Sequence, residues 1–256
     1  MSAVIEASQA PQLRSVTTEA PWTWLAAGWR DLCRARGVSL AYGLCFALIS
    51  GGITAGLWYA DKLQYLPPLA AGFMLVGPLL AVGLYEISRR LALGERPRLS
   101  HALGAIGRAP TRIAFFGLIM MLALLFWIRL AFLLFALFMG TSDVPAPEAM
   151  ISLLLFTPKG LALLVIGSLA GALLAALVFT ISVVSLPLVL DREIDAISAI
   201  LLSIAAVRRN WKALLLWAWL IAAITAIGLA SFYVGLILLF PLLGHASWHA
   251  YRALVA

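Results

Sequence analysis

The chain has 256 residues, of which 64% are hydrophobic and only 11% are charged. Soluble domains are about 45–50% apolar and about 25% charged, and the mean hydropathy of this chain is +1.04. This small number of charged residues cannot cover the surface of a soluble domain. The composition therefore excludes a soluble globular protein and predicts an integral membrane protein.

The formal net charge is +7, and the basic residues lie in short loops between apolar runs. This distribution predicts contacts with membrane lipids, anionic ones above all, and no nucleic-acid partner. Cys33 and Cys45 lie beside and inside an apolar run, so a disulfide is not expected. No cofactor is expected either.

Residues 1–20 lack the basic start and apolar core of a signal peptide, so we predict a disordered N-terminal lead-in. Residues 21–256 are predicted to form a single transmembrane domain. Apolar runs follow at 38–60, 66–88, 113–140 and 160–190. Each exceeds the roughly 20 residues that a helix needs to cross the hydrocarbon core.

The last apolar stretch, 213–244, is too long for one crossing, because a single helix would span about 48 Å. A hairpin at 228–233 would divide it into two spans. That division places both termini and all but three of the 18 Lys and Arg residues on one side. The positive-inside rule makes this side cytoplasmic. We therefore predict six spans in a bacterial inner membrane, with both termini in the cytoplasm.

A weak threefold pattern supports the hairpin. Short amphipathic segments at 24–36, 99–112 and 193–209 precede the odd-numbered spans and end in arginine. Each even-numbered span has a proline followed eight positions later by an ionisable residue: Pro78 and Glu86, Pro187 and Asp195, Pro241 and His249. The predicted fold is thus an all-α, six-transmembrane helix bundle built from three weak repeats of interfacial helix plus transmembrane hairpin.

Arg129 is the one basic residue inside an apolar run, in LLFWIRLAFLLF. An arginine in hydrocarbon costs at least about 2.5–3.5 kcal/mol unless it finds partners or snorkels to the interface. Its expected neighbours at that depth are Ser50, Thr54 and Ser168. Arg129 therefore either reaches the headgroups as a structural feature or, with these hydroxyls, binds an anion or lipid headgroup.

His245 and His249 are four residues apart and share one helix face, a spacing that suits metal ligation. If the three repeats converge, Glu86, Asp191 and Asp195 would join them in a metal site at the cytoplasmic mouth.

The alternative for these carboxylates is structural. Glu86 can pair with Arg89 or Arg90 at helical spacing, and Asp191 and Asp195 can begin the surface helix that follows. A polar, hydrogen-bonded rim is then the expected outcome. Small residues, among them Gly72, Gly77, Gly167 and Gly171, are expected to allow close helix contacts.

Three segments carry a resemblance to a known family: GPLLAVGLYEISRRLALGERP (77–97), SVVSLPLVLDREIDAISAILLSIAAVRRN (182–210) and GHASWHAYRALV (244–255). They resemble bacterial predicted integral membrane proteins that form a family of unknown function, over nearly all of the chain after residue 20. The resemblance implies an inner-membrane helical bundle and names no chemistry.

The sequence lacks HExxH, GxSxG, P-loop and paired CxxC motifs. We therefore expect a non-enzymatic accessory or scaffold protein that contacts lipids or another membrane complex. The competing hypothesis is a transporter or metal-handling protein that uses Arg129 and the His/carboxylate set.

Overall fold

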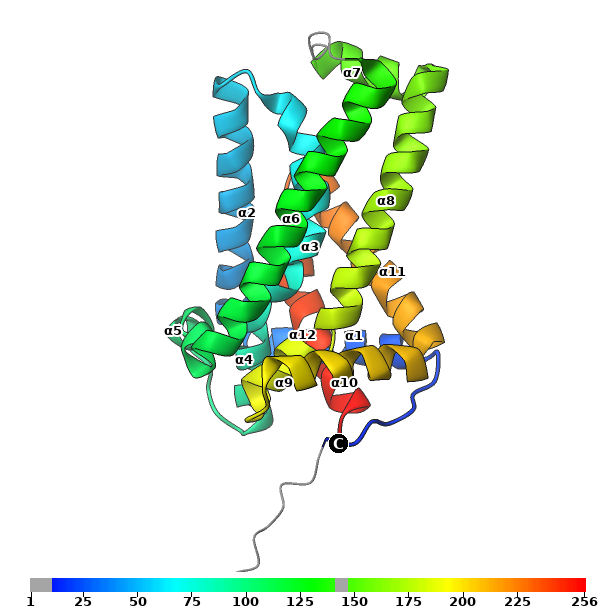
Figure 1. Ribbon diagram of the computed structural model, residues 1–256. Coiled ribbons are helices and arrows are strands. Elements are labelled where there is room, and N and C mark those ends of the chain that lie inside the picture. Colours follow the sequence, from blue (N-terminus) through cyan, green and yellow to red (C-terminus); the bar gives the residue numbers. More distant parts are fainter. Residues whose placement is uncertain (1–10, 141–146) are drawn as a thin grey trace, which may run out of the picture.

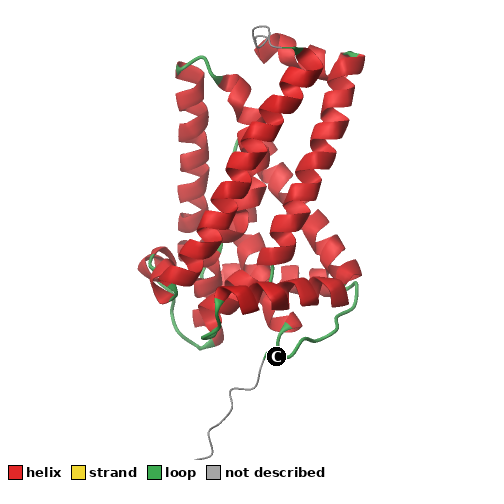
Figure 2. Cartoon of the chain, viewed as in Figure 1, coloured by secondary structure: helices red, strands yellow, loops and turns green. Residues whose placement is uncertain are grey.

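The computed structural model describes residues 11–140 and 147–256, which are almost entirely helical (Figures 1 and 2). The longer helices are α2 (Arg36–Tyr59), α3 (Leu66–Leu80), α6 (Pro110–Met139), α8 (Pro158–Ser182), α11 (Trp211–Ala230) and α12 (Leu236–Leu254). The shorter ones are α1 (Ala20–Arg34), α4 (Val82–Ala92), α5 (Leu99–Leu103), α7 (Pro147–Phe156), α9 (Ser185–Asp191) and α10 (Ala196–Arg209). Two 3-10 turns, η1 (Leu63–Tyr65) and η2 (Ala105–Arg108), complete the described elements.

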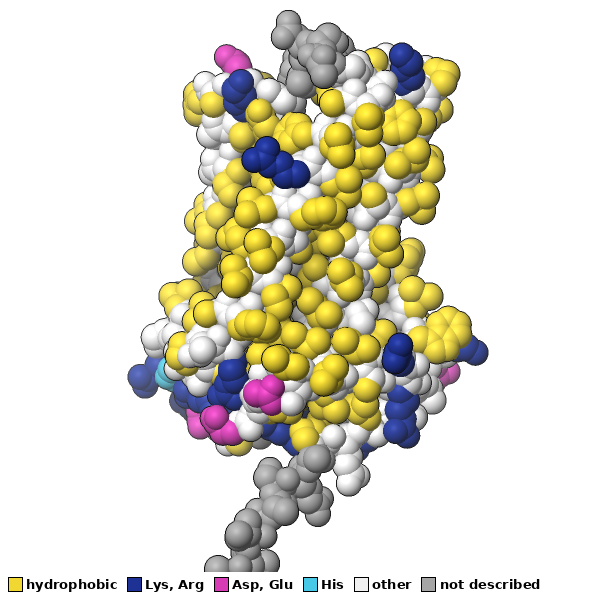
Figure 3. All heavy atoms as spheres, viewed as in Figure 1, with side chains coloured by type: hydrophobic (Ala, Val, Ile, Leu, Met, Phe, Trp, Pro, Cys, Tyr) yellow, Lys and Arg dark blue, Asp and Glu magenta, His cyan; other side chains and the backbone are white. Residues whose placement is uncertain are grey.

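Five stretches of the described chain are long and apolar enough to cross a membrane: Arg36–Tyr59, Leu63–Ala92, Pro110–Met139, Pro158–Asp191 and Trp211–Ala230. They coincide with the first five predicted spans. On the face shown in Figure 3, hydrophobic side chains cover the middle of the molecule, and most charged side chains gather at its lower end. The prediction of an all-helical, multi-pass membrane protein is confirmed.

The lower end in Figure 1 holds α1, α5, α10 and the C-terminus. We call it the basic end and the opposite one the far end. Here Leu13 pairs with Val255 in an antiparallel bridge, and the Val16 amide donates to the side-chain oxygen of Asn210 at 2.8 Å. The part of the predicted disordered lead-in that the structure describes is thus ordered, and residues 1–10 lie outside the described residues.

A short helical segment precedes α2, α6 and α11, as the amphipathic patterns predict: α1, α5 with η2, and α10. Asp195 begins α10 by accepting the Ser198 amide at 2.9 Å, the capping role that its short acidic side chain favours. An equivalence of the three units as repeats stays a prediction.

Two proline-containing spans are interrupted. The second breaks at Ala81, just after Pro78, and the fourth breaks at residues 183–184, just before Pro187. At the break before Pro187, the Val184 amide donates to the Ser203 hydroxyl at 3.3 Å, and this hydroxyl donates to the Thr180 carbonyl at 2.7 Å. Backbone groups that lose their helical hydrogen bonds in an apolar environment need other partners. Ser203 supplies them here and so holds α10 against the α8–α9 break.

The chain reverses between α11 and α12, close to the predicted hairpin. The turn includes Phe232 and Tyr233 in the left-handed region, with φ of 52° and 68°. A Cβ on Gly235 would lie 3.1 Å from the Cα of Gly228, so the two helices start in contact. α12 is not among the five candidate spans; its second half carries His245, His249 and Arg252.

α12 is the central helix at the basic end, where it contacts α1, α2, α4, α9 and α11. Glycines let neighbouring backbones approach it. A Cβ on Gly28 of α1 would lie 2.6 Å from the Ala246 nitrogen, and one on Gly43 of α2 would collide with the Ile237 carbonyl. Trp248 and Tyr251 of α12 are buried, so this helix holds the basic end together.

Gly28→Ala and Gly43→Ala should each lower the free energy of unfolding by about 1–3 kcal/mol, because the new methyl group overlaps a backbone atom of α12. The matched control is Gly51→Ala on α2, since a Cβ there meets nothing within 4 Å. Thermal unfolding in detergent measures both effects. Equal stability of the Gly43 and Gly51 variants would contradict the tight contact between α2 and α12.

Candidate functional site

Five polar side chains from four helices form a connected chain of hydrogen bonds at the basic end, which we call the inner network: Asp31, Ser39, Ser88, His245 and His249. The His245 ring lies 2.9 Å from the Ser39 hydroxyl through Nε2 and 2.8 Å from the Ser88 hydroxyl through Nδ1. The Ser88 hydroxyl donates to Asp31 at 2.8 Å, and His249 Nε2 lies 2.8 Å from the same Asp31 oxygen.

The helices determine which side chains meet. His245 and His249 are one turn apart on α12, and Ala246, which follows His245, is the residue that Gly28 of α1 approaches closely. Asp31 lies on the buried face of α1, one turn after Ala27 and Gly28. Ser39 lies in the first turn of α2, while Ser88 belongs to α4, after the break at Ala81. The network therefore joins the surface helix α1 to two spans and to α12.

The hydrogen bonds settle where the protons lie. Asp31 only accepts, so the single Ser88 hydroxyl proton points to it. Ser88 then accepts from His245, which requires a proton on Nδ1. A second proton would leave a charge on this fully buried ring, with its new N–H facing only the Ser39 hydroxyl, so the ring is neutral and Nε2 accepts the Ser39 proton.

Asp31 is ionised in this arrangement. Burial raises the pKa of its carboxyl, but the hydrogen bonds from His249 and Ser88 outweigh burial and hold that pKa below its usual value. Ser39 and His245 are fully buried, whereas the His249 side chain is 30% exposed. The network thus starts at the surface with His249 and ends inside the bundle at Ser39.

A Ser–His pair backed by a carboxylate is also the arrangement that activates a nucleophile in hydrolases. In this conformation Ser39 has no exposed surface, so no substrate carbonyl can reach its hydroxyl. What the arrangement does here is connect four helices through polar groups.

Glu86 lies nearby in a separate ion cluster. It accepts from Arg89 at 2.8 Å and from Arg90 at 2.6 Å, and the Arg108 guanidinium is 3.5 Å away. Arg90 also pairs with Glu95 at 2.7 Å. The pairing of Glu86 with Arg89 and Arg90 is the structural alternative that the sequence offered, and with Arg108 added the cluster holds a local excess of positive charge.

The metal site predicted from His245, His249, Glu86, Asp191 and Asp195 does not assemble. Asp191 accepts from Tyr251 at 2.8 Å, Asp195 caps α10, and Glu86 is held by arginines. Both His245 nitrogens are occupied by serine hydroxyls. Among residues 11–140 and 147–256, no three His, Cys, Asp or Glu side chains come together as a metal site.

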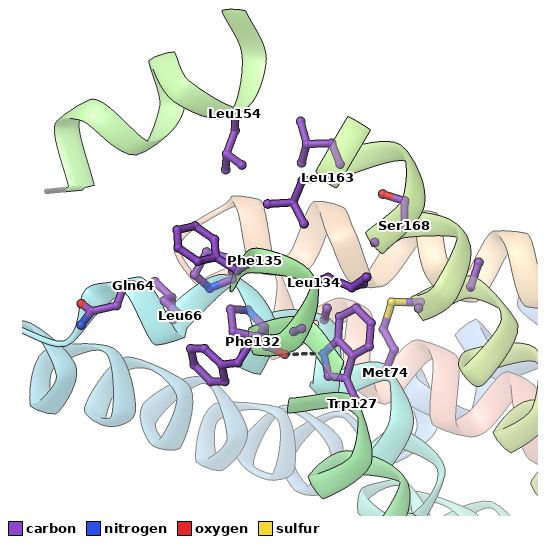
Figure 4. A pocket seen from close by; sticks show the side chains of 18 of the residues that line it. Gln64, Leu66, Met74, Trp127, Phe132, Leu134, Phe135, Leu154, Leu163 and Ser168 are labelled. Carbon is purple, nitrogen blue, oxygen red and sulfur yellow. Dashed lines mark hydrogen bonds between the residues drawn. The ribbon is translucent and has the colours of Figure 1, made fainter. Parts of the chain in front are cut away.

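The predicted neighbours of Arg129 also lie elsewhere. The Thr54 hydroxyl donates to the Ser50 carbonyl at 3.0 Å and lies 2.6 Å from the Tyr233 hydroxyl, so both residues belong to the contact between α2 and the α11–α12 turn. Ser168 lines an apolar hollow between α3, α6, α7 and α8 (Figure 4). The expected set of Arg129 with three hydroxyls is therefore not formed.

Arg129 itself is exposed on α6. Trp127 lines the hollow and donates to the Pro68 carbonyl at 2.8 Å, and Phe132 contacts Tyr65 edge-on with centroids 5.1 Å apart. Arg129 lies between them in sequence but roughly 200° around the helix from Trp127. Along the bundle axis Arg129 thus lies at the depth of the first turn of α3, near the far end. A long side chain at this depth reaches the membrane interface easily.

Asp31, Ser39 and Ser88 were missed by sequence reasoning. Asp31 had a usable signal, since it follows Trp24, Ala27 and Gly28 on the apolar face of an amphipathic helix, where an acid needs a partner. Ser39 and Ser88 had none, because serines are common within apolar helices.

Acid should destabilise the protein through His245. In the unfolded chain this imidazole takes up a proton at about pH 6.5, whereas in the folded protein the same proton would place a charge on a fully buried ring. The unfolded state therefore binds the proton first, so the free energy of unfolding is highest above about pH 6.5 and decreases as the pH falls below it. Asp31 loses its contribution only below about pH 4, because its pKa is depressed.

Thermal unfolding in detergent at pH 7.5, 6.0 and 5.0 measures this loss. His245→Gln should flatten the pH dependence, and His101→Gln, which changes a histidine outside the inner network, should retain it. A wild-type pH profile in His245→Gln would show that the buried ring does not carry the effect.

No curated protein and no solved structure matches the chain. A family model matches residues 65–191, which run from η1 to the end of α9. This range includes Glu86 and Ser88 but not Asp31, Ser39 or the two network histidines, and it is narrower than the resemblance expected from residue 21 onwards. Through this segment, about half of its length, the chain belongs to the family described as "Predicted integral membrane protein (DUF2189)", whose function is unknown.

Proposed function

We propose that this protein is a non-enzymatic scaffold of the bacterial inner membrane that holds anionic lipids at the cytoplasmic surface. In this proposal the chain crosses the membrane six times as three hairpin units, with α12 as the last crossing. Both termini then lie in the cytoplasm, on the side of the basic end.

The observation that carries the proposal is the composition of the short helices at the basic end. Each exposes large apolar side chains: Trp22 and Trp29 on α1, Leu103 and Ile106 in the α5–η2 segment, and Ile197 and Leu201 on α10. Helices with an apolar exposed face beside basic residues lie in the membrane interface. We infer that these faces enter the headgroup region around the ends of the spans.

Arginine residues lie on the same short helices as these exposed apolar side chains. Arg30 and Arg34 of α1 and Arg208 of α10 are exposed, and no ion pair to them is found within the described part of the chain. A guanidinium group binds phosphate oxygens in pairs. These three residues are therefore available to phospholipid headgroups, while Arg89 and Arg90 are engaged by Glu86.

The inner network supports the same role. It fixes α1 to α2, α4 and α12, so the lipid-contacting helix is presented on a rigid base. A bound lipid or a neighbouring membrane complex would meet a preformed surface, which lowers the entropy cost of binding.

The transport hypothesis is less well supported. Arg129 is exposed on the α6 face opposite the hollow, and the candidate metal ligands are bonded in separate places. Saturable uptake of an anion or divalent metal into proteoliposomes, lost in Arg129→Ala, would replace the scaffold proposal.

Arg30→Gln/Arg34→Gln/Arg208→Gln should weaken binding of phosphatidylglycerol by roughly fivefold for each removed charge, and added salt should weaken the wild type. Native mass spectrometry with phosphatidylglycerol or phosphatidylcholine measures the binding. The control Arg129→Gln removes an exposed charge at the far end and should leave this binding unchanged. Equal losses in both variants would mean that the basic end has no special affinity.

The topology has its own test. A reporter that is active only in the periplasm should give no signal when fused after Ala256 and a strong signal when fused after Gly140. Activity at Ala256 would remove the sixth crossing and place the C-terminus outside.

A further inference from the structure

The far half of the molecule contains a large apolar hollow of about 730 Å³, which we call the far-end hollow. Its walls come from α3, α6, α7 and α8, and Gln64 and Ser168 are the polar side chains other than the Trp127 indole that line it. Figure 4 shows aromatic and aliphatic side chains of these helices around one shared space. Its volume falls in the range of roughly 300–1,000 Å³ that is typical of ligand sites.

A second hollow of about 350 Å³ lies between α3, α8, α11 and α12. It extends towards Tyr85 and Ser247, in the direction of the basic end. Met74, Ala172 and Ala175 line both hollows. The two spaces therefore meet at one flexible methionine and two small side chains, and together they follow α3 and α8 as one elongated groove.

We propose that this groove holds the hydrocarbon tail of a membrane phospholipid. The site lies away from the arginines of the basic end, so the proposal goes beyond the scaffold function and stands or falls independently of it. The tail enters at the far end, passes Met74, and ends between α8 and α11.

The shape of the groove excludes another helix as the occupant. α8 contacts both α3 and α6, and a Cβ on Gly171 would lie only 3.0 Å from the Trp127 ring. A helix with side chains is about 10–12 Å across and cannot enter between these elements. A polymethylene chain is roughly 4 Å wide, the distance of one carbon–carbon contact, and can enter.

The lining also disfavours water. A buried water needs two to four polar partners, whereas the walls offer mainly leucine, phenylalanine, alanine and methionine side chains. In a bilayer the apolar molecules that surround the groove are lipid tails, and each buried methylene contributes about 0.8 kcal/mol.

The far-end mouth suits a phosphate headgroup. Lys62 precedes Leu63, and Lys159 lies one turn before Leu163, and both leucines line the far-end hollow. The two lysines are exposed, so the ammonium groups can reach a phosphate at the interface above the groove. The two lysines at the mouth therefore favour a phospholipid from the membrane leaflet at the far end as the occupant.

Two glycines provide a direct test. A Cβ on Gly77, which lines the second hollow, or on Gly167, which lines the far-end hollow, would meet nothing within 4 Å. Leucine can therefore occupy either space without a backbone collision, and it favours helix more than glycine does by about 0.8–1.0 kcal/mol. Gly51 of α2 is equally open but lies outside the groove, so Gly51→Leu is the matched control.

The probe is phosphatidylglycerol with a diazirine near the end of one acyl chain, photolysed with the full-length protein in nanodiscs. We expect residue-level mass spectrometry to find adducts at Met74, Ala172 and Ala175, which line both hollows, and on α11. Gly77→Leu and Gly167→Leu should each reduce these adducts at least fivefold, while Gly51→Leu should not. Adducts at the exposed Leu173 report surrounding lipid and should persist in every variant.

Thermal unfolding in detergent verifies that the variants fold, and either hollow-filling variant suffices for the test. Adducts at Met74, Ala172 and Ala175 that are no more frequent than those at Leu173, or that persist when both glycines are replaced, would overturn the proposal. The first result would mean that the groove is closed to lipid, and the second that the label reports only lipid at the outer surface.

Discussion

The two hydrogen bonds of the buried His245 ring are the interaction on which the basic end depends. In a mostly apolar molecule a buried polar side chain is costly unless the protein itself satisfies it. His245 is satisfied by Ser39 of α2 and Ser88 of α4, and Ser88 in turn donates to Asp31 of α1. Four helices must therefore be in place together for all of these groups to be paired, which gives the network its specificity.

The positions of the other elements at this end follow from that requirement. α12 has to lie close to α1 and α2, which is why glycine occurs at Gly28 and Gly43, where any side chain would meet the backbone of α12. Once α1 is fixed, its Trp22 and Trp29 face outwards. Ser203 holds α10 to the α8–α9 break in a similar way. The surface helices are thus anchored by internal hydrogen bonds and keep apolar faces for the membrane.

The far half of the molecule is built differently. Small residues on α3 and α8 were expected to bring helices together, and Gly72 and Gly171 do contact the side chains of α6. Gly77 and Gly167 instead face open space. One end is therefore closed by polar contacts, while the middle and the far end leave a groove of lipid-tail width. The contrast is consistent with a rigid anchoring surface at one interface and an adaptable, lipid-filled interior.

Much of the fold could be predicted because apolar length and charge leave few alternatives. The first four runs correspond to α2, α3 with α4, α6 and α8 with α9, and the reversal expected at 228–233 occurs after α11, at 231–235. The pairing of Glu86 with Arg89 and Arg90 followed from helical spacing alone. In each case the information is local in the sequence.

The site could not be predicted to the same extent, because it depends on how helices are rotated and which of them meet. The place of Arg129 in its apolar run gives its depth in the membrane but not the direction of its side chain, and the hydroxyls expected beside it, Ser50, Thr54 and Ser168, belong to other contacts. The proline-plus-eight register aligned Glu86, Asp195 and His249 along the chain. It carried no information about their neighbours, and the three side chains bind different partners. Ser39 and Ser88 become recognisable only once α12 is placed between their helices.

The protonation state of His245 tests the central claim most directly. Nitrogen-15 NMR of protein labelled at its histidines, with the signal assigned by comparison with His245→Gln, reports which ring nitrogen carries the proton. The network requires a neutral ring at pH 7 with the proton on Nδ1 and a bare Nε2 that accepts from Ser39. A proton on Nε2 alone, or a doubly protonated ring at pH 7, would contradict the account.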